Sequence, residues 1–328
     1  MQFNSQKMIG RSPIFLDALA LITRVARYDA PVLIQGETGT GKELAARSIH
    51  YQSARRAAPF IPLNCGALPD GLIESELFGA ERGAYTDARE ARAGLVAMAE
   101  GGTLFLDELD SLPVRAQVSL LRFLQDHSYR PVGGKRECHG DVRIVAAASP
   151  QLDALLGSGA FRGDLAFRLN VLMIEMPPLR LREGDAELLA DNFIAQHARQ
   201  YALPVRPLDP ASREWLASYA WPGNVRELDN RIQRAMLLSD DGPLQLAPRA
   251  GAPCAPTRRA PGDGEPVNEF NAARERALAS FERAYLERLM ESAGGNVTRA
   301  ARLAGKERRA LGKLLKKHGL GHDAFDTR

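Results

Sequence analysis

The sequence has few cysteines and no long apolar run. Its three cysteines among 328 residues, Cys65, Cys138 and Cys254, are odd in number and widely spaced, which argues against a disulfide framework and favours a reducing compartment. A run of about 18 apolar residues, enough to span a membrane, is missing. The first residues also lack the charged-then-apolar pattern of a leader. We therefore expect a cytoplasmic protein with no membrane partner.

The positive charge is concentrated near the C-terminus. Hydrophobic residues make up 45% of the chain and charged residues 25%, which is ordinary for folded domains, and the formal net charge is only +3. Between Arg302 and Lys317, however, seven cations accompany a single anion, Glu307. Such a local excess of cations is typical of a nucleic-acid contact.

The first 175 residues alternate helical and strand patterns. Three short apolar runs, "PVLIQ", "TLFLDE" and "DVRIVAAAS", lie among amphipathic segments, which predicts a parallel sheet with helices on both faces. We predict four parts in the chain. They are an α/β subdomain at 1–175, a helical subdomain at 176–240, a flexible linker rich in Pro, Gly and Ala at 241–267, and an all-α domain at 268–328.

A phosphate-binding loop follows the first apolar run. The segment "GETGTGKE" lies between a strand pattern and a helix pattern, which is the context in which glycine-rich backbone N–H groups and a lysine bind nucleotide phosphates. Glu43 stands where many such loops have Ser or Thr to hold magnesium. The predicted nucleotide-binding residues of this loop are Gly36, Glu37, Thr38, Gly39, Thr40, Gly41, Lys42 and Glu43.

Two carboxylates follow the second apolar run. Asp107 would hold Mg²⁺, directly or through water, and Glu108 would polarise the attacking water. The alternative is that both simply cap the end of a strand. With the phosphate loop upstream, we predict an ATP hydrolase. Arg162, Arg168 and Arg226 are candidate cations for the charge that develops on the γ-phosphate.

The C-terminal segment contains two short helical patterns, at 296–304 and 307–319. Ala300, Ala301 and Ala304 form a small apolar face on the first, and we expect three leucines of the second to face inward, namely Leu311, Leu314 and Leu315. This pattern predicts a DNA-binding helix-turn-helix, whereas the alternative is a basic solvated helix. The candidate DNA contacts are Lys306, Arg308, Arg309, Lys313, Lys316 and Lys317.

Five motifs together resemble one family. The segments "GETGTGKE", "ELFGAERGAYTDA", "GGTLFLDE", "FRGDLAFRLNV" and "WPGNVREL" are similar in order and spacing to the AAA+ domain of sigma-54-dependent transcriptional activators, or bacterial enhancer-binding proteins. The resemblance runs from about residue 8 to 240. The C-terminal pattern also resembles the family's Fis-like helix-turn-helix.

The resemblance implies a ring, usually a hexamer, that binds ATP between subunits. It implies that Arg162 and Arg168 act in trans on a neighbour's nucleotide and that Arg226 is the sensor arginine of the helical lid. Asn64 would correspond to the asparagine that restrains the catalytic glutamate, here Glu108. Sigma-54 RNA polymerase and upstream double-stranded DNA are the implied partners.

The resemblance also assigns the segment "GAYTDA" to the loop that contacts sigma-54. Its residues here are Gly83, Ala84, Tyr85, Thr86, Asp87 and Ala88. Tyrosine keeps the ring of the family's phenylalanine. Asp87 replaces a glycine, which puts a negative charge and a more restricted backbone at the tip of the loop.

Three further departures bear on function. Ser149 stands where the family commonly has asparagine, which predicts slower or less coupled hydrolysis. Lys306 replaces an aliphatic residue, and Gly312 lies inside the second helix, where it costs about 1 kcal/mol against alanine. Asp87, Ser149 and Lys306 favour an alternative, a DNA-binding regulator that uses nucleotide for assembly and does not act on sigma-54. Because little sequence precedes Met8, we expect control by a trans-acting regulatory protein or by expression level.

Overall fold

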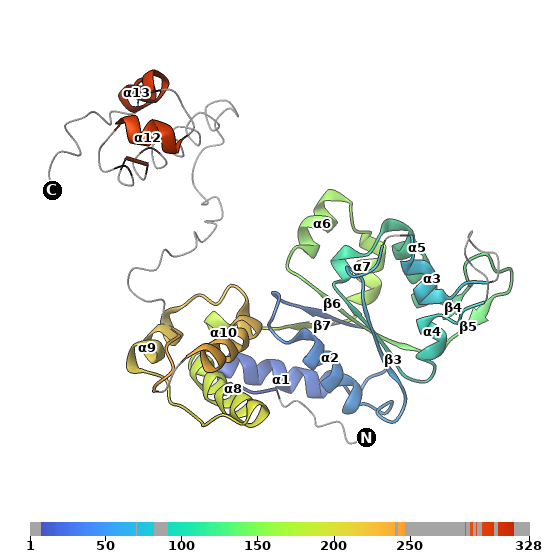
Figure 1. The fold of residues 1–328 in the computed structure, drawn as a ribbon. Helices are drawn as coiled ribbons and strands as arrows, with labels where there is room; N and C mark the ends of the chain where they lie inside the picture. The colour runs from blue at the N-terminus through green and yellow to red at the C-terminus, as the bar shows by residue number, and fades with distance from the viewer. Residues whose placement is uncertain are drawn as a thin grey trace. The chain divides into compact units, whose positions relative to one another are not determined.

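The computed structural model describes two compact units, 1–252 and 253–328 (Figure 1). The described residues are 8–69, 71–81, 91–239 and 242–246 in the first unit. In the second they are Leu286, Leu289, Met290, Ala293, 297–304 and 308–317. Within these residues, no helix combines the length and the hydropathy that crossing a bilayer requires.

The first unit is built on a five-stranded parallel sheet. Its strand order is β2-β3-β6-β1-β7, so the strand that precedes the phosphate loop lies between β6 and β7. A separate antiparallel pair joins β4 and β5. The strands are β1 (Val32–Gln35), β2 (Phe60–Asn64), β3 (Thr103–Asp107), β4 (Ser128–Tyr129), β5 (Cys138–His139), β6 (Arg143–Ala148) and β7 (Leu172–Glu175).

Helices cover both faces of the sheet, as Figure 1 shows. The α/β part contains α1 (Pro13–Val25), α2 (Lys42–Tyr51), α3 (Ile73–Phe78), α4 (Leu95–Met98), η1 (Leu109–Ser111), α5 (Val114–Asp126), α6 (Leu152–Ser158) and α7 (Gly163–Leu169). Alternate strand residues face opposite sides: on β6, Val145 packs with α1 and α2, whereas Ile144 packs with α3, α5 and α7. A sheet buried on both faces explains why its strands are continuous apolar runs.

A helical lid completes the first unit. It contains η2 (Leu179–Leu181), α8 (Asp185–Tyr201), α9 (Pro210–Ser218) and α10 (Asn224–Leu238). Trp221, with 1% of its surface exposed, lies in the lid core beside Leu216 and Leu228. Leu244 and Leu246 are buried in the same core, so residues 242–246, which begin the predicted linker, pack on the lid.

The second unit has a small core of its own. Its described helices are α12 (Val297–Leu303) and α13 (Arg308–Lys317). Ala300 and Ala301 on α12 pack with Leu311 and Leu315 on α13. Small residues on one helix allow the leucines of the other to approach closely, as the apolar pattern of the sequence predicts.

The structure agrees with the predicted fold class: a parallel sheet covered by helices carries a helical lid, and two helices form the core of the second unit. The three strands expected from apolar runs are β1, β3 and β6. Two strands were missed. The exposed Pro62 interrupts the apolar run of β2, and the four apolar residues at 171–174, which contain most of β7, are too few to distinguish a strand from a helix. The exact domain boundaries remain predictions.

Candidate nucleotide site

The candidate catalytic groups meet at the carboxyl edge of the sheet. The phosphate loop follows β1, Asp107 ends β3, and Ser149 follows β6. Asn64 ends β2 and is the register partner of Asp107. Parallel strands end at the same edge, so residues that are far apart in the sequence become neighbours here.

Glycine geometry shapes the phosphate loop. Gly39 has φ 81° and Gly41 has φ 97°, both in the left-handed region that favours glycine. A Cβ atom on Gly39 would also collide with the backbone carbonyl of Gly223 in the lid. The loop therefore depends on glycine for its conformation and for its close approach to the lid, and it leads directly into the N-terminus of α2 at Lys42.

Lys42 is held against the loop backbone. Its Nζ donates hydrogen bonds to the carbonyl oxygens of Gly36 at 2.7 Å and Glu37 at 3.2 Å. Burial lowers the pKa of Lys42, whereas the charges of Asp107 and Asp110 act to raise it. An ammonium group is thus positioned inside the loop, where nucleotide phosphates would compete with carbonyls for it.

Asp107 and Glu108 occupy different environments. Burial raises the pKa of Asp107, against the opposing effects of the Glu108 backbone N–H and of Lys42. That N–H donates to Asp107 Oδ1 at 3.0 Å. Glu108 is exposed and has φ 52°, which is uncommon for a residue other than glycine. Such local strain, at the end of a buried strand, is typical of functional sites.

Asn64 and Glu108 both lie beside Gly66. A Cβ atom on Gly66 would collide with Glu108 Oε2 and would lie 3.4 Å from Asn64 Oδ1. Asn64 Oδ1 accepts hydrogen bonds from the N–H groups of Gly66 at 2.8 Å and Ala67 at 3.0 Å. The two side chains are therefore neighbours, and Asn64 is engaged with the turn that follows β2. The assignment of Asn64 as a restraint on Glu108 remains a prediction.

The structure adds Asp110, which the sequence did not single out. Its carboxylate accepts hydrogen bonds from the Ser149 backbone N–H at 3.2 Å and from Ser149 Oγ at 2.8 Å. This pair links the end of β6 to the turn after β3. The hydroxyl of Ser149 is thus directed to Asp110. Only the proximity of Asp110 to the "LFLDE" motif could have drawn attention to it.

The lid contacts the phosphate loop through its "WPGN" turn. Asn224 donates from Nδ2 to Glu37 Oε2 and to the Thr38 carbonyl, both at 3.1 Å. The Val225 N–H donates to the Gly39 carbonyl at 3.1 Å. Arg180 pairs with Glu37 at 2.6 Å. Sequence reasoning missed Arg180 and Asn224 as site residues, although Asn224 lies within a motif that it quoted.

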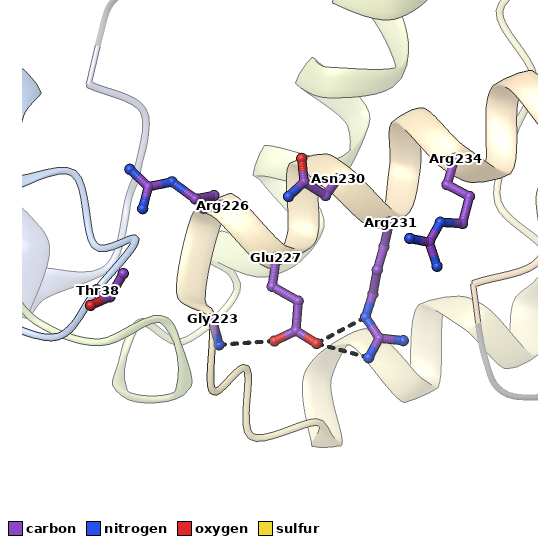
Figure 2. Close-up of a pocket in the computed structure, with 7 residues that line it drawn as sticks. All are labelled: Thr38, Gly223, Arg226, Glu227, Asn230, Arg231 and Arg234. Carbon is purple, nitrogen blue, oxygen red and sulfur yellow. Dashed lines mark hydrogen bonds and ion pairs between the residues drawn. The ribbon is translucent and has the colours of Figure 1, made fainter. Parts of the chain in front are cut away.

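Arg226 lines a cavity of about 440 Å³ between the phosphate loop and α10. Figure 2 shows its side chain directed toward the loop that carries Thr38. Glu227 instead bonds to Arg231 and to the Gly223 N–H. Arg234 also lines this cavity, and both it and Arg226 are exposed. The cavity beside the phosphate loop therefore has two guanidinium groups in its lining.

The described hydrogen bonds of the Arg162 and Arg168 side chains are made outside this cluster. Arg162 pairs with Asp164 at 2.7 Å, and this pairing raises the pKa of the guanidinium. Arg168 donates from Nε to the Leu124 carbonyl at 3.4 Å. Both side chains are exposed on or beside α7. Their described hydrogen bonds do not reach the phosphate loop of the same chain, which is compatible with a partner in another chain.

The site has the features that a magnesium nucleotide requires. The left-handed glycines, the N-terminus of α2 and Lys42 suit phosphate oxygens. Asp107, a half-buried carboxylate, suits a hard cation that keeps most of its ligands from water and phosphate. Within the described residues there is no cluster of three or more His, Cys, Asp or Glu side chains that would hold a metal alone.

Two predicted interfaces lie wholly or partly outside the described residues. The proposed sigma-54 contact, 83–88, lies outside them, as does Lys306. On α13, Lys313 is exposed. The side chains of the remaining candidate DNA contacts also lie outside the described part of the chain: Arg308, Arg309, Lys316 and Lys317.

Family models match three consecutive parts of the chain. The sigma-54 interaction domain matches 8–175, the AAA+ ATPase lid domain 180–248, and the Fis family of bacterial regulatory proteins 277–318. With the P-loop, parallel sheet and lid described above, these matches define an AAA+ ATPase-type domain joined to a helix-turn-helix. The first match covers about half of the chain.

Several known proteins are similar to this chain over nearly its whole length. Nitrogen fixation protein VnfA of Azotobacter vinelandii is 41% identical over 327 residues, which are 99% of this chain and 61% of VnfA. Response regulator protein PilR of Pseudomonas aeruginosa is 42% identical, over 96% of this chain and 70% of PilR. The crystal structure of NtrX from Brucella abortus in complex with ATP aligns with TM-score 0.72 and 33% identity, over 95% and 69% of the two chains. The chain belongs to the family of sigma-54-dependent transcriptional activators.

Proposed function

We propose that this protein hydrolyses ATP to drive transcription initiation, binding upstream DNA and remodelling closed complexes of sigma-54 RNA polymerase into open complexes. The observation that carries the proposal is the convergence, in one compact unit, of Lys42, Asp107 and Glu108 with a lid that contacts the phosphate loop. A bacterial activator of this kind acts in the cytoplasm.

The nucleotide chemistry is assigned to specific groups. Residues 36–43 would bind the phosphates, and Asp107 would hold Mg²⁺, which supplies charge neutralisation when it is bound. Glu108 would orient and polarise water, since it is exposed at the edge where Asp107 ends β3. Asn64, beside Glu108 at Gly66, would restrain that carboxylate. The ATP complex of NtrX, which aligns with 95% of this chain, supports nucleotide binding.

We further propose that the active form is a homo-oligomeric ring, a hexamer as in the family. The described hydrogen bonds of Arg162 and Arg168 do not reach the phosphate loop of their own chain. These arginines would instead reach a neighbour's nucleotide. Arg226 would meet the phosphates in its own chain. Arginines that stabilise charge on a transferred phosphoryl group raise rates strongly.

The C-terminal unit would bind double-stranded DNA. The exposed Lys313 lies on α13, whose buried side is formed by Leu311 and Leu315. A helix with an apolar inner face and a basic outer face fits the major groove. We also propose that a partner protein regulates this activator in trans. The boundaries between its parts are proposed at residues 175, 240 and 267.

The alternative function rests on Asp87. A regulator that binds DNA and uses nucleotide for assembly would keep the phosphate loop but lose sigma-54 contact. The intact set of Lys42, Asp107 and Glu108 favours hydrolysis. Asp87 and Ser149 are the residues that favour the alternative.

The decisive test is open-complex formation by purified sigma-54 RNA polymerase with this protein and ATP, on a promoter that the family activates from solution. Lys42→Ala serves as the blank. Activity above the blank supports the proposal and shows that Asp87 is tolerated. Normal hydrolysis without open complexes, restored by Asp87→Gly, would instead establish the alternative.

A further inference from the structure

Glu37 is the point at which two parts of the lid contact the phosphate loop. Arg180 donates to both carboxylate oxygens, at 2.6 Å to Oε1 and 2.8 Å to Oε2, and Asn224 donates to Oε2 at 3.1 Å. The hydrogen bond from Arg180 lowers the pKa of Glu37, so the carboxylate stays charged. A bidentate Arg–carboxylate pair restricts orientation as well as distance.

Asn224 uses both ends of its side-chain amide in this contact. The residue is fully buried. Its Oδ1 accepts from the Leu179 N–H at 2.8 Å, and its Nδ2 donates to Glu37 and to the Thr38 carbonyl. One amide therefore joins the lid segment η2, the start of α10 and the phosphate loop. Unpairing a buried polar group costs more than the loss of one exposed hydrogen bond.

The backbone of Asn224 suits this residue too. Its φ of 50° lies in the left-handed region, which asparagine and aspartate tolerate best after glycine. The next residue, Val225, donates its N–H to the Gly39 carbonyl. Lid groups thus bind the carbonyls of both Thr38 and Gly39, and the orientation of those peptide units determines where their N–H groups point.

We propose that Arg180 and Asn224 are positioning residues that hold the phosphate loop through Glu37 and keep α10, with Arg226, over Thr38. The proposal rests on the proposed use of ATP. Its physical content is that the lid and the phosphate loop move together: a shift of the lid alters the loop, and the state of the nucleotide can in turn alter the lid. Neither residue needs to touch the reacting atoms.

The first test uses isosteric exchanges in the full chain. Asn224→Asp keeps the left-handed turn but places a carboxylate against Glu37. Glu37→Gln can keep its oxygen toward Asn224 only with its amide N–H₂ group against Arg180, so it loses one of the two Arg180 hydrogen bonds. We expect each single variant to raise the KM for ATP about tenfold, the effect of losing one charge-assisted hydrogen bond. At saturating ATP, kcat should stay within about threefold of the original.

The double variant, which carries Glu37→Gln and Asn224→Asp together, makes the test specific. Its new amide at position 37 can donate to its new carboxylate at position 224, so we expect its KM to be at least about threefold closer to the original than that of Asn224→Asp alone. Recovery is incomplete, since the Thr38 carbonyl still lacks its donor. A residue that merely stabilised the lid would not respond to the charge at position 37. A double variant as impaired as the worse single variant would overturn the proposal.

Arg180 has a matched control. Arg213 pairs with Glu187 at 2.6 Å elsewhere in the lid, and its side chain is 38% exposed compared with 43% for Arg180. Arg180→Ala should raise the KM for ATP about fivefold, whereas Arg213→Ala should leave it within about twofold. Equal effects of the two substitutions would overturn the assignment of Arg180.

Hydrogen exchange without nucleotide separates this proposal from the proposed function. Amides at 36–41 and 223–226 should exchange about tenfold faster in Asn224→Asp, and the double variant should recover part of the protection. Unchanged exchange in the single variant would refute the positioning role. If the unmodified protein neither bound nor hydrolysed ATP, the proposed function would fail, and the exchange result would still decide whether the lid holds the loop.

Discussion

Charged side chains have different surroundings in the phosphate-loop region and in the C-terminal unit. Around the loop, Glu37 and Asp110 have specific partners in other segments of the chain, and Lys42 donates to carbonyl oxygens of the loop itself. In the C-terminal unit, the described core consists of apolar residues such as Ala300 and Leu311, and Lys313 is exposed.

This difference indicates that substitutions act through different interactions in the two units. A network of buried and half-buried polar groups is costly when one member is removed, because its partners lose their hydrogen bonds. A basic helix on a small apolar core instead depends on the core for its shape and on solvent-exposed charge for its contacts. Substitutions in the first unit should therefore have larger effects than comparable ones in the second.

The largest effect is expected at Asp185, which connects the start of the α/β part to the lid. It is fully buried, and its carboxylate accepts from the Arg11 N–H at 2.6 Å, from Ser12 and from Arg182. Asp185→Ala leaves Arg182 buried without its charged partner, which should cost about 3–5 kcal/mol in the free energy of unfolding. Denaturant unfolding followed by tryptophan fluorescence measures this, because both tryptophans, Trp215 and Trp221, lie in the lid.

Asp191→Ala is the matched control for Asp185, since it removes an exposed carboxylate from the same helix. It should change stability by less than about 1 kcal/mol. Burial opposes ionisation of Asp185, but hydrogen bonds from Arg11, Arg182 and Ser12 hold its pKa below the usual value. Its contribution is therefore present above about pH 4 and is lost as the pH falls through the lower folded-state pKa. A stability gap to Asp185→Ala that widened in acid would contradict this.

The second effect concerns catalysis alone. Glu108→Gln keeps the shape of the side chain and removes the group that would polarise water, so kcat for ATP hydrolysis should fall at least about 100-fold. The Kd for ATP should stay within about threefold, because Lys42 and the phosphate loop are unchanged. Steady-state hydrolysis and equilibrium binding of ATP give the two values. A comparable loss of affinity and rate would argue that Glu108 acts by holding the loop rather than the water.

A smaller, stabilising effect is expected in the C-terminal unit. Gly312 lies inside α13, and a Cβ atom there would meet no neighbouring atom within 4 Å among the described residues. Gly312→Ala should stabilise the helix by up to about 1 kcal/mol. The stabilisation should appear as slower amide hydrogen exchange over 308–317. Denaturant unfolding of the first unit, followed by tryptophan fluorescence, should be unchanged. Destabilisation would show that the glycine serves a contact outside the described residues.

The smallest effect is expected at Ser149, whose hydroxyl donates to Asp110. Asparagine can keep a donor toward Asp110 and reach further from the end of β6. We expect Ser149→Asn to raise kcat for ATP hydrolysis about threefold, within the range of one modest polar contact. Ser149→Ala, which lacks the side-chain donor and keeps the backbone N–H bond to Asp110, is the comparison variant. Identical rates for the original protein and Ser149→Asn would end the idea that serine slows hydrolysis.

Local sequence determined much of this protein. The phosphate loop, the strands β1, β3 and β6, and the two helices of the C-terminal unit follow from short patterns, because glycine geometry, apolar runs and helical periodicity act within a few residues. The carboxylates at 107 and 108 could also be found, since they follow a buried run directly.

Only the tertiary structure decided the rest. Strand β2 is interrupted by Pro62 and the apolar run of β7 is short, and both strands are fixed by pairing with β3 and β1. The contacts of Glu37 with Arg180, and of Asp110 with Ser149, join residues that are 143 and 39 positions apart. No local pattern encodes such pairs. They arise because parallel strands bring their carboxyl ends to one edge, and because the lid folds back onto the loop there.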